Sequence, residues 1–291
     1  MNLDFVSASR ASRQARVFLA IGAVAAGLAS QSALAQTYLG TNQPFAVMGA
    51  TAVTCVVASA VSGDLGISPN GAASITGYPV PPCTVTGTIH AADGVALTAQ
   101  TDLVTAYNTL SSLSCTANLS GQDLGTVGVL IPGVYCFNSS AQLTGALILD
   151  AGGDPNAAFV FKIGSTLTTA AGASVSVING GSACGVSWRV GSSATLGTTT
   201  ALLGNIVALT SITGNTGSSV GGRALARNGA VTLSGNVDNI CGAYGGSGIP
   251  AGLVPGGGSN AVPTLSQWAM ILLAVLLALS GGYLAMRRKS R

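Results

Sequence analysis

The feature that most constrains this chain is a series of short, similar β-like segments in its second half, each followed by a turn rich in Gly, Asn or Ser. Segment 161–165 (FKIGS) is echoed by 188–192 (WRVGS), and segment 205–209 by 223–227. One aliphatic residue per segment recurs at gaps of 24, 29, 16 and 21 residues: Leu143, Leu167, Leu196, Ile212 and Leu233. Recurrence on this scale is typical of solenoids. The unequal gaps predict coils with loops of different length, and the Gly-rich corners favour a parallel β-helix.

The residues on either side of each central aliphatic are small and mostly carry hydroxyl groups. Because neighbouring side chains of a strand point to opposite faces, an inward aliphatic places both neighbours outside. The outward pairs are Gln142/Thr144, Thr166/Thr168, Thr195/Gly197, Ser211/Thr213 and Thr232/Ser234. Five coils about 4.8 Å apart predict a flat, uncharged face about 20 Å tall. Thr and Ser are common on any solvated strand, so the pattern alone leaves open whether this face binds anything.

One stretch, residues 91–113, has the periodicity of a helix. Its apolar positions follow an i, i+3/i+4, i+7 stripe, which comprises Val95, Ala99, Leu103, Ala106, Tyr107, Leu110 and Leu113. Asp93 lies near the predicted N-terminus, where the helix dipole favours an anion. We expect one amphipathic helix that lies along the side of the solenoid.

Charged residues are scarce, and this excludes several classes of function. Only 7% of the 291 residues are charged, against about 25% in a typical soluble domain. Between Gln36 and Ala261 the chain has four cations, seven Asp and no Glu. A nucleic-acid partner is not expected, because binding to phosphates needs a basic stripe. We expect Arg223 and Arg227 to be solvated and to provide solubility.

The few residues that could support catalysis have simpler explanations, so we expect neither an enzyme nor a cofactor. Asp150 and Asp154 could form the carboxylate pair that glycoside hydrolysis generally needs. Both lie in the turn 150–155, where Asx turns account for them. The single histidine, His90, precedes the predicted helix and is expected to cap it or to be solvated.

The first 35 residues are typical of a secretory signal peptide. Arg10, Arg13 and Arg16 form a basic region, residues 17–29 are apolar, and 33–35 (ALA) is a small-x-small cleavage site. The mature chain would begin at Gln36. The alternative is an uncleaved membrane anchor, although the apolar run is short for a membrane span.

All six cysteines lie in the exported part of the chain, and their even number predicts three disulfides. Proximity along the sequence favours three of the possible pairs: Cys55–Cys83, Cys115–Cys136 and Cys184–Cys241. A zinc site is not expected, because the chain has no C-x-x-C pair and only one histidine.

The C-terminus has three parts in a fixed order. A Gly/Pro/Ser-rich linker over 245–261 is followed by a short motif within 262–268, whose residues are Pro263, Thr264, Leu265, Ser266 and Trp268. An apolar transmembrane helix over 269–286 and a basic tail complete the segment 262–291. This order resembles the IPTL-type C-terminal sorting signal of Gram-negative bacteria. The resemblance implies an exosortase-like membrane protease, cleavage and delivery to the cell surface; a permanent anchor remains the alternative.

Several stretches across residues 38–245 resemble the microbial ice-binding protein family. They are 39–41, 45–48, 63–69, the pair Ala106–Tyr107, 133–135, 153–157, 164–167, 204–208 and 222–227. The resemblance implies a discontinuous right-handed β-helix with a flanking α-helix, which adsorbs to ice and catalyses no reaction. Applied to the outward positions, it implies an ice-binding face formed by Thr144, Thr166, Thr168, Thr195, Ser211, Thr213, Thr232 and Ser234. Gln142 and Gly197 interrupt this face.

We therefore expect a mainly β chain: a right-handed parallel β-helix over residues 36–244, one long α-helix alongside, and a C-terminal transmembrane helix. The exported body is expected to be monomeric and to adsorb to the surface of ice crystals. The alternative is a surface structural or adhesive protein on the same fold, also without enzymatic activity.

Overall fold

The structure is a computed structural model that describes residues 37–239. The predicted signal peptide, linker, sorting motif and transmembrane helix lie outside these residues. Within the described range, no helix is both long and apolar enough to cross a membrane.

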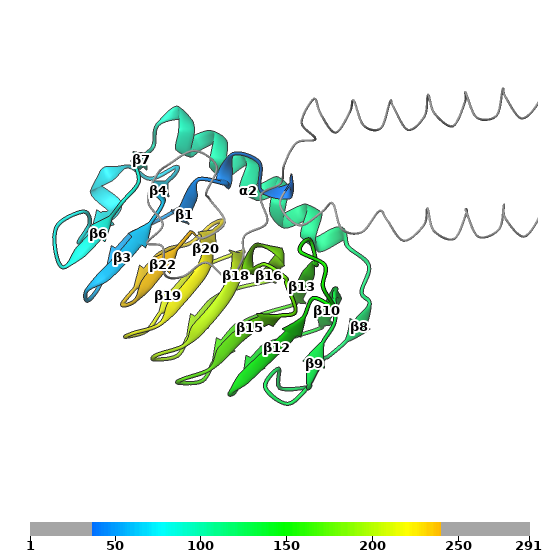
Figure 1. The fold of residues 1–291 in the computed structure, drawn as a ribbon. Helices are drawn as coiled ribbons and strands as arrows, with labels where there is room; N and C mark the ends of the chain where they lie inside the picture. Colours follow the sequence, from blue (N-terminus) through cyan, green and yellow to red (C-terminus); the bar gives the residue numbers. More distant parts are fainter. Residues whose placement is uncertain (1–36, 240–291) are drawn as a thin grey trace, which may run out of the picture. The chain divides into compact units, whose positions relative to one another are not determined.

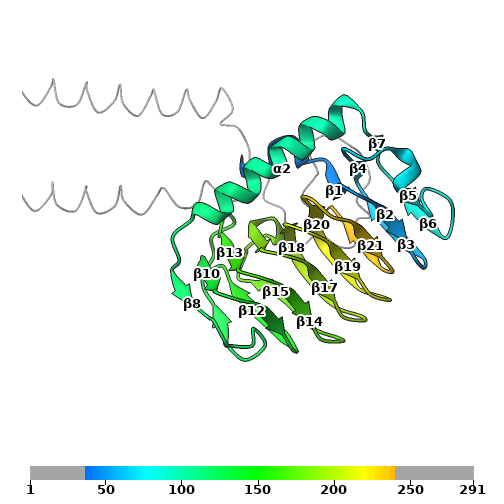
Figure 2. The same ribbon diagram turned by 180° about the vertical axis from the view of Figure 1, so that it is seen from behind.

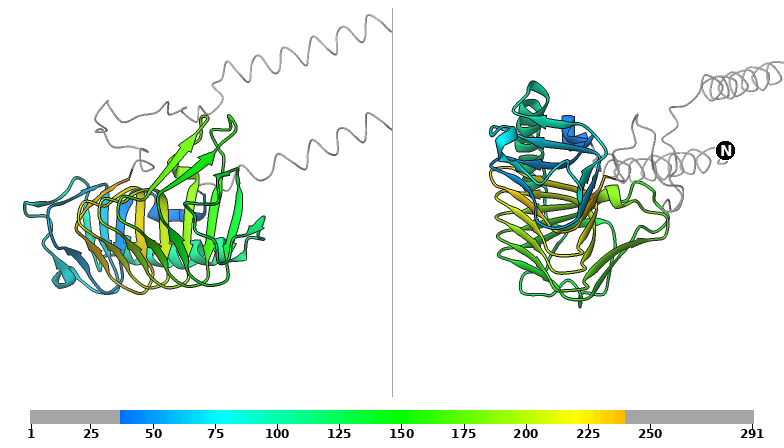
Figure 3. Two further views of the ribbon diagram at one scale, coloured as in Figure 1. Left: turned by 90° about the horizontal axis from the view of Figure 1, so that it is seen from below. Right: turned by 90° about the vertical axis from the view of Figure 1, so that its left-hand side faces the viewer.

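The described chain is mainly β, and its parallel strands follow one another in stacked coils, as the side view in Figure 3 shows. The segments that echo each other in sequence are neighbours in the stack, because Phe161 pairs with Trp188 and Asn205 with Arg223. The predicted solenoid of parallel strands is confirmed.

The coils form three faces, each a run of parallel strands. The helix face consists of β8 (Ala117–Asn118), β10 (Gly133–Phe137), β13 (Phe159–Ile163), β16 (Val186–Val190), the second halves of β18 (Ala201–Ala208) and β20 (Ser219–Ala226), β1 (Phe45–Gly49), β4 (Asp64–Ile67) and β7 (Ile89–Ala91). The threonine face consists of β11 (Ala141–Leu143), β14 (Leu167–Thr169), β17 (Ala194–Leu196), β19 (Ile212–Gly214), β21 (Val231–Leu233), β2 (Val53–Cys55) and β5 (Ile75–Thr76).

The third face consists of β9 (Val129–Leu130), β12 (Ala146–Asp150), β15 (Ser174–Ile178), the first halves of β18 and β20, β22 (Asn236–Asp238), β3 (Ser59–Ser62) and β6 (Cys83–Val85). β18 and β20 bend from this face to the helix face at Gly204 and Gly222, whose φ angles are 109° and 156°. Such positive φ values favour glycine. Short 3-10 helices occur at η2 (Thr37–Asn42), η3 (Ala72–Ser74) and η4 (Ala183–Gly185).

The N-terminal coils stack onto the last coil of the C-terminal half. β1 pairs with β20, β2 with β21, and β3 with β22. In Figure 1 the blue strands accordingly lie beside the yellow and orange ones. The repeats that can be recognised in the sequence all follow the helix, so they did not predict that the first strands complete the same solenoid.

The predicted helix is confirmed as α2 (Gly94–Ser112), which lies along the helix face (Figure 2). It begins three residues later than predicted, because Ile89–Ala91 pair as β7 and Asp93 is the N-cap. The Asp93 carboxylate accepts a hydrogen bond from the Ala96 amide at 2.8 Å. At 19 residues the helix is about 28 Å long, and its apolar stripe packs against Val160, Val207 and Leu225.

One position of the predicted apolar stripe is wrong. Val95 is 48% exposed, while its neighbour Ala96 is fully buried. The buried stripe runs through Ala96, Ala99 and Leu103, and Val95 lies about 100° around the helix from Ala96, beyond the edge of this stripe.

The interior of the solenoid is filled by inward side chains from all three faces. Three aromatic rings stack along the axis in successive coils. The ring centroids of Tyr135 and Phe161 are 5.6 Å apart, and those of Phe161 and Trp188 are 4.1 Å apart. The Trp188 indole Nε1 donates to the Leu203 carbonyl at 2.9 Å, so its polar group is satisfied inside the core.

The prediction that Arg223 is solvated is wrong. It is 1% exposed, and its guanidinium donates to the Gln43 carbonyl at 2.6 Å and to Asn205 Oδ1 at 2.9 Å. Burial lowers the pKa of Arg223 to about 10, which leaves the group cationic at neutral pH. The Asn239 side chain also donates to the Gln43 carbonyl, at 2.9 Å. Both contacts join the last C-terminal coil to the segment that leads into β1.

Two of the three predicted disulfides, Cys55–Cys83 and Cys115–Cys136, are confirmed. Cys184 is also disulfide-bonded. Its predicted partner, Cys241, lies outside the described residues, so that pairing stays a prediction.

Candidate binding face

Each strand of the threonine face contributes one outward residue, and these residues form a single file. Neighbours in the file are direct partners across the parallel strands. In order they are Gln142, Thr168, Thr195, Thr213, Thr232, Thr54 and Thr76. We call the six threonines the threonine column. At about 4.8 Å per strand, the column is about 24 Å long.

The residues that flank each column position are apolar or small and point into the core, which forces the threonine outward. Leu167 and Thr169 are buried on either side of Thr168, and Val231 and Leu233 on either side of Thr232. In the described part of the chain, none of the six column hydroxyls has a protein hydrogen-bond partner. Since χ1 of threonine is stiff, each strand presents one methyl and one free hydroxyl to solvent.

A second file lies on the side where the strands begin, and its hydroxyls are used within the protein. The Thr166 hydroxyl donates to Ser140 Oγ at 2.8 Å. Ser193 Oγ accepts from the Ser211 amide at 3.3 Å, and Ser211 Oγ accepts from the Ala230 amide at 3.2 Å. These contacts link adjacent coils, so Thr166 and Ser211 have less capacity for an external partner than the column has.

A third file lies on the side where the strands end, and its residues differ in chemistry from coil to coil. Thr144 and Ser234 belong to it, but the intervening coils place Ala170, Gly197 and Asn215 at the corresponding positions. The eight predicted residues therefore divide into four column members, Thr168, Thr195, Thr213 and Thr232, and two on each flank.

The expected alignment of the central aliphatics in one row is wrong. Leu143 is the partner of Thr169, and Leu196 is the partner of Gly214. Each three-residue strand has two inward positions, and the aliphatic occupies sometimes the first and sometimes the second. The sequence could not distinguish the two positions, although the outward direction of the neighbouring threonines is as expected.

Thr54 and Thr76, which extend the column by two strands, were not among the predicted residues. Thr54 pairs with Thr232 on one side and with Thr76 on the other. A usable signal was present, because Val53 and Cys55 flank Thr54 just as apolar residues flank the other column threonines. The residues precede the helix, however, where no repeat had been recognised.

Two polar residues continue the file beyond Thr168, where the column ends. Gln142 pairs with Thr168, and Asp123 forms an isolated parallel bridge with Gln142. Asp123 Oδ1 accepts from the Gly125 and Thr144 amides at 2.7 and 3.0 Å. Burial by itself would raise the pKa of Asp123, but hydrogen bonds from Thr144 and Gly125 outweigh it and leave the pKa lowered. A carboxylate thus marks one end of an otherwise uncharged face.

The strands of the threonine face contain no charged residue. Within residues 37–239, no group of three His, Cys, Asp or Glu side chains could hold a metal ion. Asp150 and Asp154 each accept a hydrogen bond at 2.8 Å from the amide two residues ahead, as in Asx turns. His90 does not cap α2 itself; its Nδ1 lies 2.8 Å from Oδ2 of Asp93, the residue that does.

Comparison with known proteins shows the family to which this chain belongs. The Ice-binding-like family model matches residues 47–239, and the IPTL-CTERM motif matches residues 260–288. An ice-binding protein of Nostoc sp. (strain HG1) is 50% identical over 231 residues, which cover 79% of this chain and 84% of that relative.

Solved structures agree with these sequence matches. The crystal structure of an ice-binding protein from an Antarctic biological consortium has a TM-score of 0.65 and 42% identity, covering 69% of this chain and 89% of the other. That of an ice-binding protein from Antarctomyces psychrotrophicus has a TM-score of 0.65 and 34% identity, covering 69% and 96%. These proteins are named for ice binding rather than for a reaction. The resemblance seen in the sequence is confirmed: the chain belongs to the ice-binding-like family.

Proposed function

We propose that this protein binds ice through the threonine column and so restricts the growth of ice crystals. The observation that carries the proposal is the direct register of six outward threonines whose hydroxyls have no protein partner. The flanking residues Thr144, Thr166, Ser211 and Ser234 form the margins of the contact.

The column suits a crystal of water for physical reasons. Parallel strands space the column hydroxyls regularly, about 4.8 Å apart, and the surface of a water crystal is likewise a regular array. Each hydroxyl can take the place of a water molecule, while the adjacent methyl group disfavours disordered solvent. Because threonine is stiff at χ1, little side-chain entropy is lost when the face adsorbs.

The proposal includes export and processing. Residues 1–35 are removed as a signal peptide, and 245–261 link the right-handed, monomeric body to the sorting signal 262–291, with its transmembrane helix 269–286. An exosortase-like protease in a Gram-negative inner membrane would process that signal and release the protein to the cell surface. The IPTL-CTERM match supports this route. Asn239, the last described residue, donates to the Gln43 and Pro44 carbonyls, away from the strands of the threonine face.

The test is direct observation of single ice crystals in a nanolitre osmometer with the oxidised body, residues 36–245. Faceted crystals with a gap between melting and freezing are expected, together with arrested recrystallisation. Round, freely growing crystals in the presence of folded protein would contradict ice binding. The fold would then be that of a surface structural or adhesive protein without enzymatic activity.

A further inference from the structure

Three exposed valines lie together at the end of the threonine column. Val56 is 60% exposed, Val57 48% and Val80 67%. Val56 and Val57 follow β2, and Val80 lies in the segment that joins β5 to β6. Both segments turn from the threonine face to the third face in adjacent coils, and the Cys55–Cys83 disulfide connects them. We call these three residues the valine corner.

The backbone places Val56 on the same side of the sheet as the column. The Val56 amide donates to the Leu233 carbonyl at 2.9 Å, so the parallel ladder continues one residue beyond β2. Strand alternation then points Val56 outward, as Thr54 does, about 6.7 Å further along the strand. Through Val56, which takes the position of Ser234 in the third file, the valine corner adjoins the column at Thr54.

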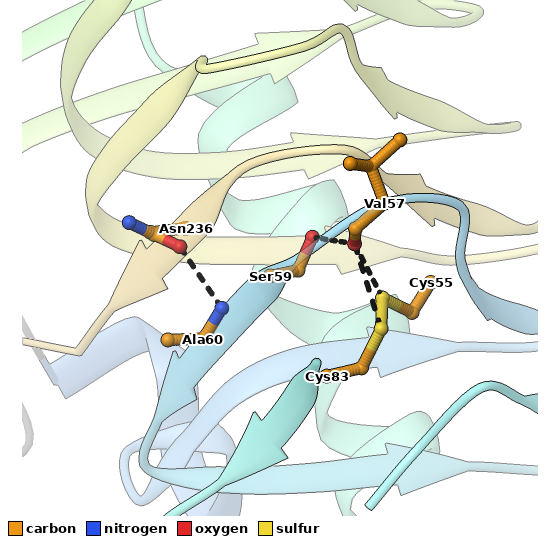
Figure 4. The surroundings of a disulfide bond; sticks show 6 residues. All are labelled: Cys55, Val57, Ser59, Ala60, Cys83 and Asn236. Atoms are coloured by element: carbon orange, nitrogen blue, oxygen red, sulfur yellow. Dashed lines mark hydrogen bonds between the residues drawn. A yellow bond between two sulfur atoms is a disulfide. The ribbon is translucent and has the colours of Figure 1, made fainter. Parts of the chain in front are cut away.

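Two hydrogen bonds hold the segment that carries Val57. The Ser59 hydroxyl donates to the Val57 carbonyl at 3.2 Å, and the Ala60 amide donates to Asn236 Oδ1 at 2.9 Å. Figure 4 shows the Val57 side chain pointing away from the disulfide while its carbonyl faces the two sulfur atoms. Such fixed exposure of apolar groups differs from a loosely attached loop that could fold back over them.

The corresponding corner has different chemistry in the preceding coils. There the positions that correspond to Val56 and Val57 are occupied by Ser234 and Gly235, by Asn215 and Thr216, and by Gly197 and Thr198. Only at the end that carries Thr54 and Thr76 do large aliphatic side chains replace them. A group of exposed apolar residues of this kind marks a contact surface more often than single exposed ones do.

We infer that the valine corner is part of the ice-contacting surface and extends the threonine column with an apolar contact. The inference rests on the proposed function. Valine has the shape of threonine without the hydroxyl, so Val56 presents methyl groups at the edge of the file. Water next to exposed methyl groups is orientationally restricted, and adsorption to ice removes that apolar surface from liquid water. Ice is the occupant because the corner is uncharged, fixed and continuous with the column.

The test compares lysine substitutions in two pairs of similarly exposed aliphatic residues. V56K and V80K alter the valine corner, while V129K and I131K alter residues that are 54% and 66% exposed at the opposite end of the solenoid, away from the threonine face. Labelled protein adsorbed to a single ice crystal is measured by fluorescence. We expect a several-fold decrease for V56K and V80K and unchanged adsorption for V129K and I131K. V56T, which keeps the shape, should retain adsorption.

Three results would overturn the inference. Unchanged adsorption of V56K and V80K, with loss in the column variant T195K, would confine ice contact to the threonines. An equal decrease at V129K and I131K would mean that added charge anywhere weakens adsorption. Loss of self-association in V56K, measured by sedimentation, would make the corner a contact between copies of this chain. If T195K also adsorbs fully, the proposed function itself fails at this face, which is a separate outcome. Unchanged far-UV circular dichroism excludes misfolding as the cause.

Discussion

Each strand of the threonine face offers solvent one side chain in the column, so a single substitution changes one rung of the file. Thr195 and Thr213 each have two column neighbours, whereas Thr168 and Thr76 lie at its ends. Residues in the middle of the column should therefore matter most for adsorption. Their side chains have no protein hydrogen bonds to lose, so stability and ice affinity can be changed separately.

Replacing Thr213 by Tyr should abolish most ice adsorption while the fold stays intact. The bulky ring would hold the neighbouring hydroxyls away from a flat crystal surface. Outward substitutions of this kind change the free energy of unfolding by about 0.5 kcal/mol or less. Thermal hysteresis and chemical denaturation measure the two effects. Ser176→Tyr, at an exposed position on the third face, is the matched control and should leave thermal hysteresis unchanged.

Replacing Gln142 by Thr should increase ice adsorption. Gln142 is the direct partner of Thr168 and is exposed, so the substitution adds a seventh rung about 4.8 Å from the sixth. Thermal hysteresis at equal concentration should rise above that of the natural protein. Gln142→Ala, which shortens the side chain without adding a hydroxyl, should not show the increase; equal gains in both variants would mean that glutamine merely obstructs the surface.

Asp123 should make stability depend on acid pH. Its pKa is lowered in the folded state, so its contribution is fully present above the ordinary value of about 3.9 and is lost as pH falls through the folded value. The melting temperature of the natural protein should therefore fall on acidification below about pH 4. Asp123→Asn should melt at a lower temperature at neutral pH and lose less on acidification. An equal decrease of the melting temperature on acidification in both proteins would contradict this role.

At the scale of elements, the column is assembled from two separate parts of the chain. Thr168 to Thr232 come from the coils after α2, while Thr54 and Thr76 come from the coils before it. The pairing of β2 with β21 joins the two parts, and the contacts of Arg223 and Asn239 with Gln43 hold the same junction. Helix α2 carries the chain along the helix face from β7, at one end of the stack, to β8, at the other end. The coils after the helix can therefore stack back toward the coils before it.

Arg223→Met should open this junction. The substitution leaves Asn205 Oδ1 without its buried donor and leaves the Gln43 carbonyl with Asn239 as its remaining side-chain donor, at a cost of about 3 kcal/mol. Hydrogen exchange should increase in β1, β2 and β3 more than in β13 or β16, and thermal hysteresis should fall toward that of a Thr54→Ala/Thr76→Ala variant. Adding Arg223→Met to the Thr54→Ala/Thr76→Ala variant should then reduce thermal hysteresis little further.

Arg227→Met is the matched control for that experiment. Arg227 lies over the Tyr107 ring, with its guanidinium carbon 5.5 Å from the centroid, and it makes no contact across the junction in the described structure. Arg227→Met should lower the free energy of unfolding by about 1 kcal/mol or less and leave hydrogen exchange in β1 unchanged. Equal exchange in both arginine variants would assign Arg223 a general role in stability rather than a role at the junction.

At the scale of the whole described body, the solenoid is nearly one-dimensional, so its end coils have a neighbour on one side only. The two described disulfides lie at these ends. Cys55–Cys83 connects β2 with β6, and Cys115–Cys136 connects the segment before β8 with β10. Covalent links thus strengthen the two places where stacking is weakest and where strand edges are open.

Removing either disulfide should therefore lower stability by about 3 kcal/mol, but only one removal should strongly affect ice adsorption. C55S/C83S loosens the end that carries Thr54, Thr76 and the valine corner. C115S/C136S loosens the end near Asp123, beyond the threonine column. Calorimetry and fluorescence on ice crystals measure both effects. Equal losses of adsorption in the two variants would show that the whole stack, rather than the nearby coils, supports the face.

The sequence by itself determined the type of structure. The repeated segments predicted stacked parallel coils, the stripe over 91–113 predicted the helix, and small hydroxylated neighbours of Leu167 and Ile212 predicted an uncharged outward face. These features depend on local periodicity and on residue chemistry, which can be seen along the chain. The same is true of Cys55–Cys83 and Cys115–Cys136, whose partners are close in sequence.

The tertiary structure alone decided which residues share a column. Whether an aliphatic takes the first or second inward position depends on its partner in the next coil, so Leu143 and Leu196 aligned differently from Leu167 and Ile212. The entry of Thr54 and Thr76 depends on coils that are far apart in sequence but adjacent in the stack. Arg223 was buried for the same reason, since its acceptor, Gln43, lies 180 residues away along the chain. Pairing between distant segments is set by the fit of whole coils, and no local pattern in the sequence encodes it.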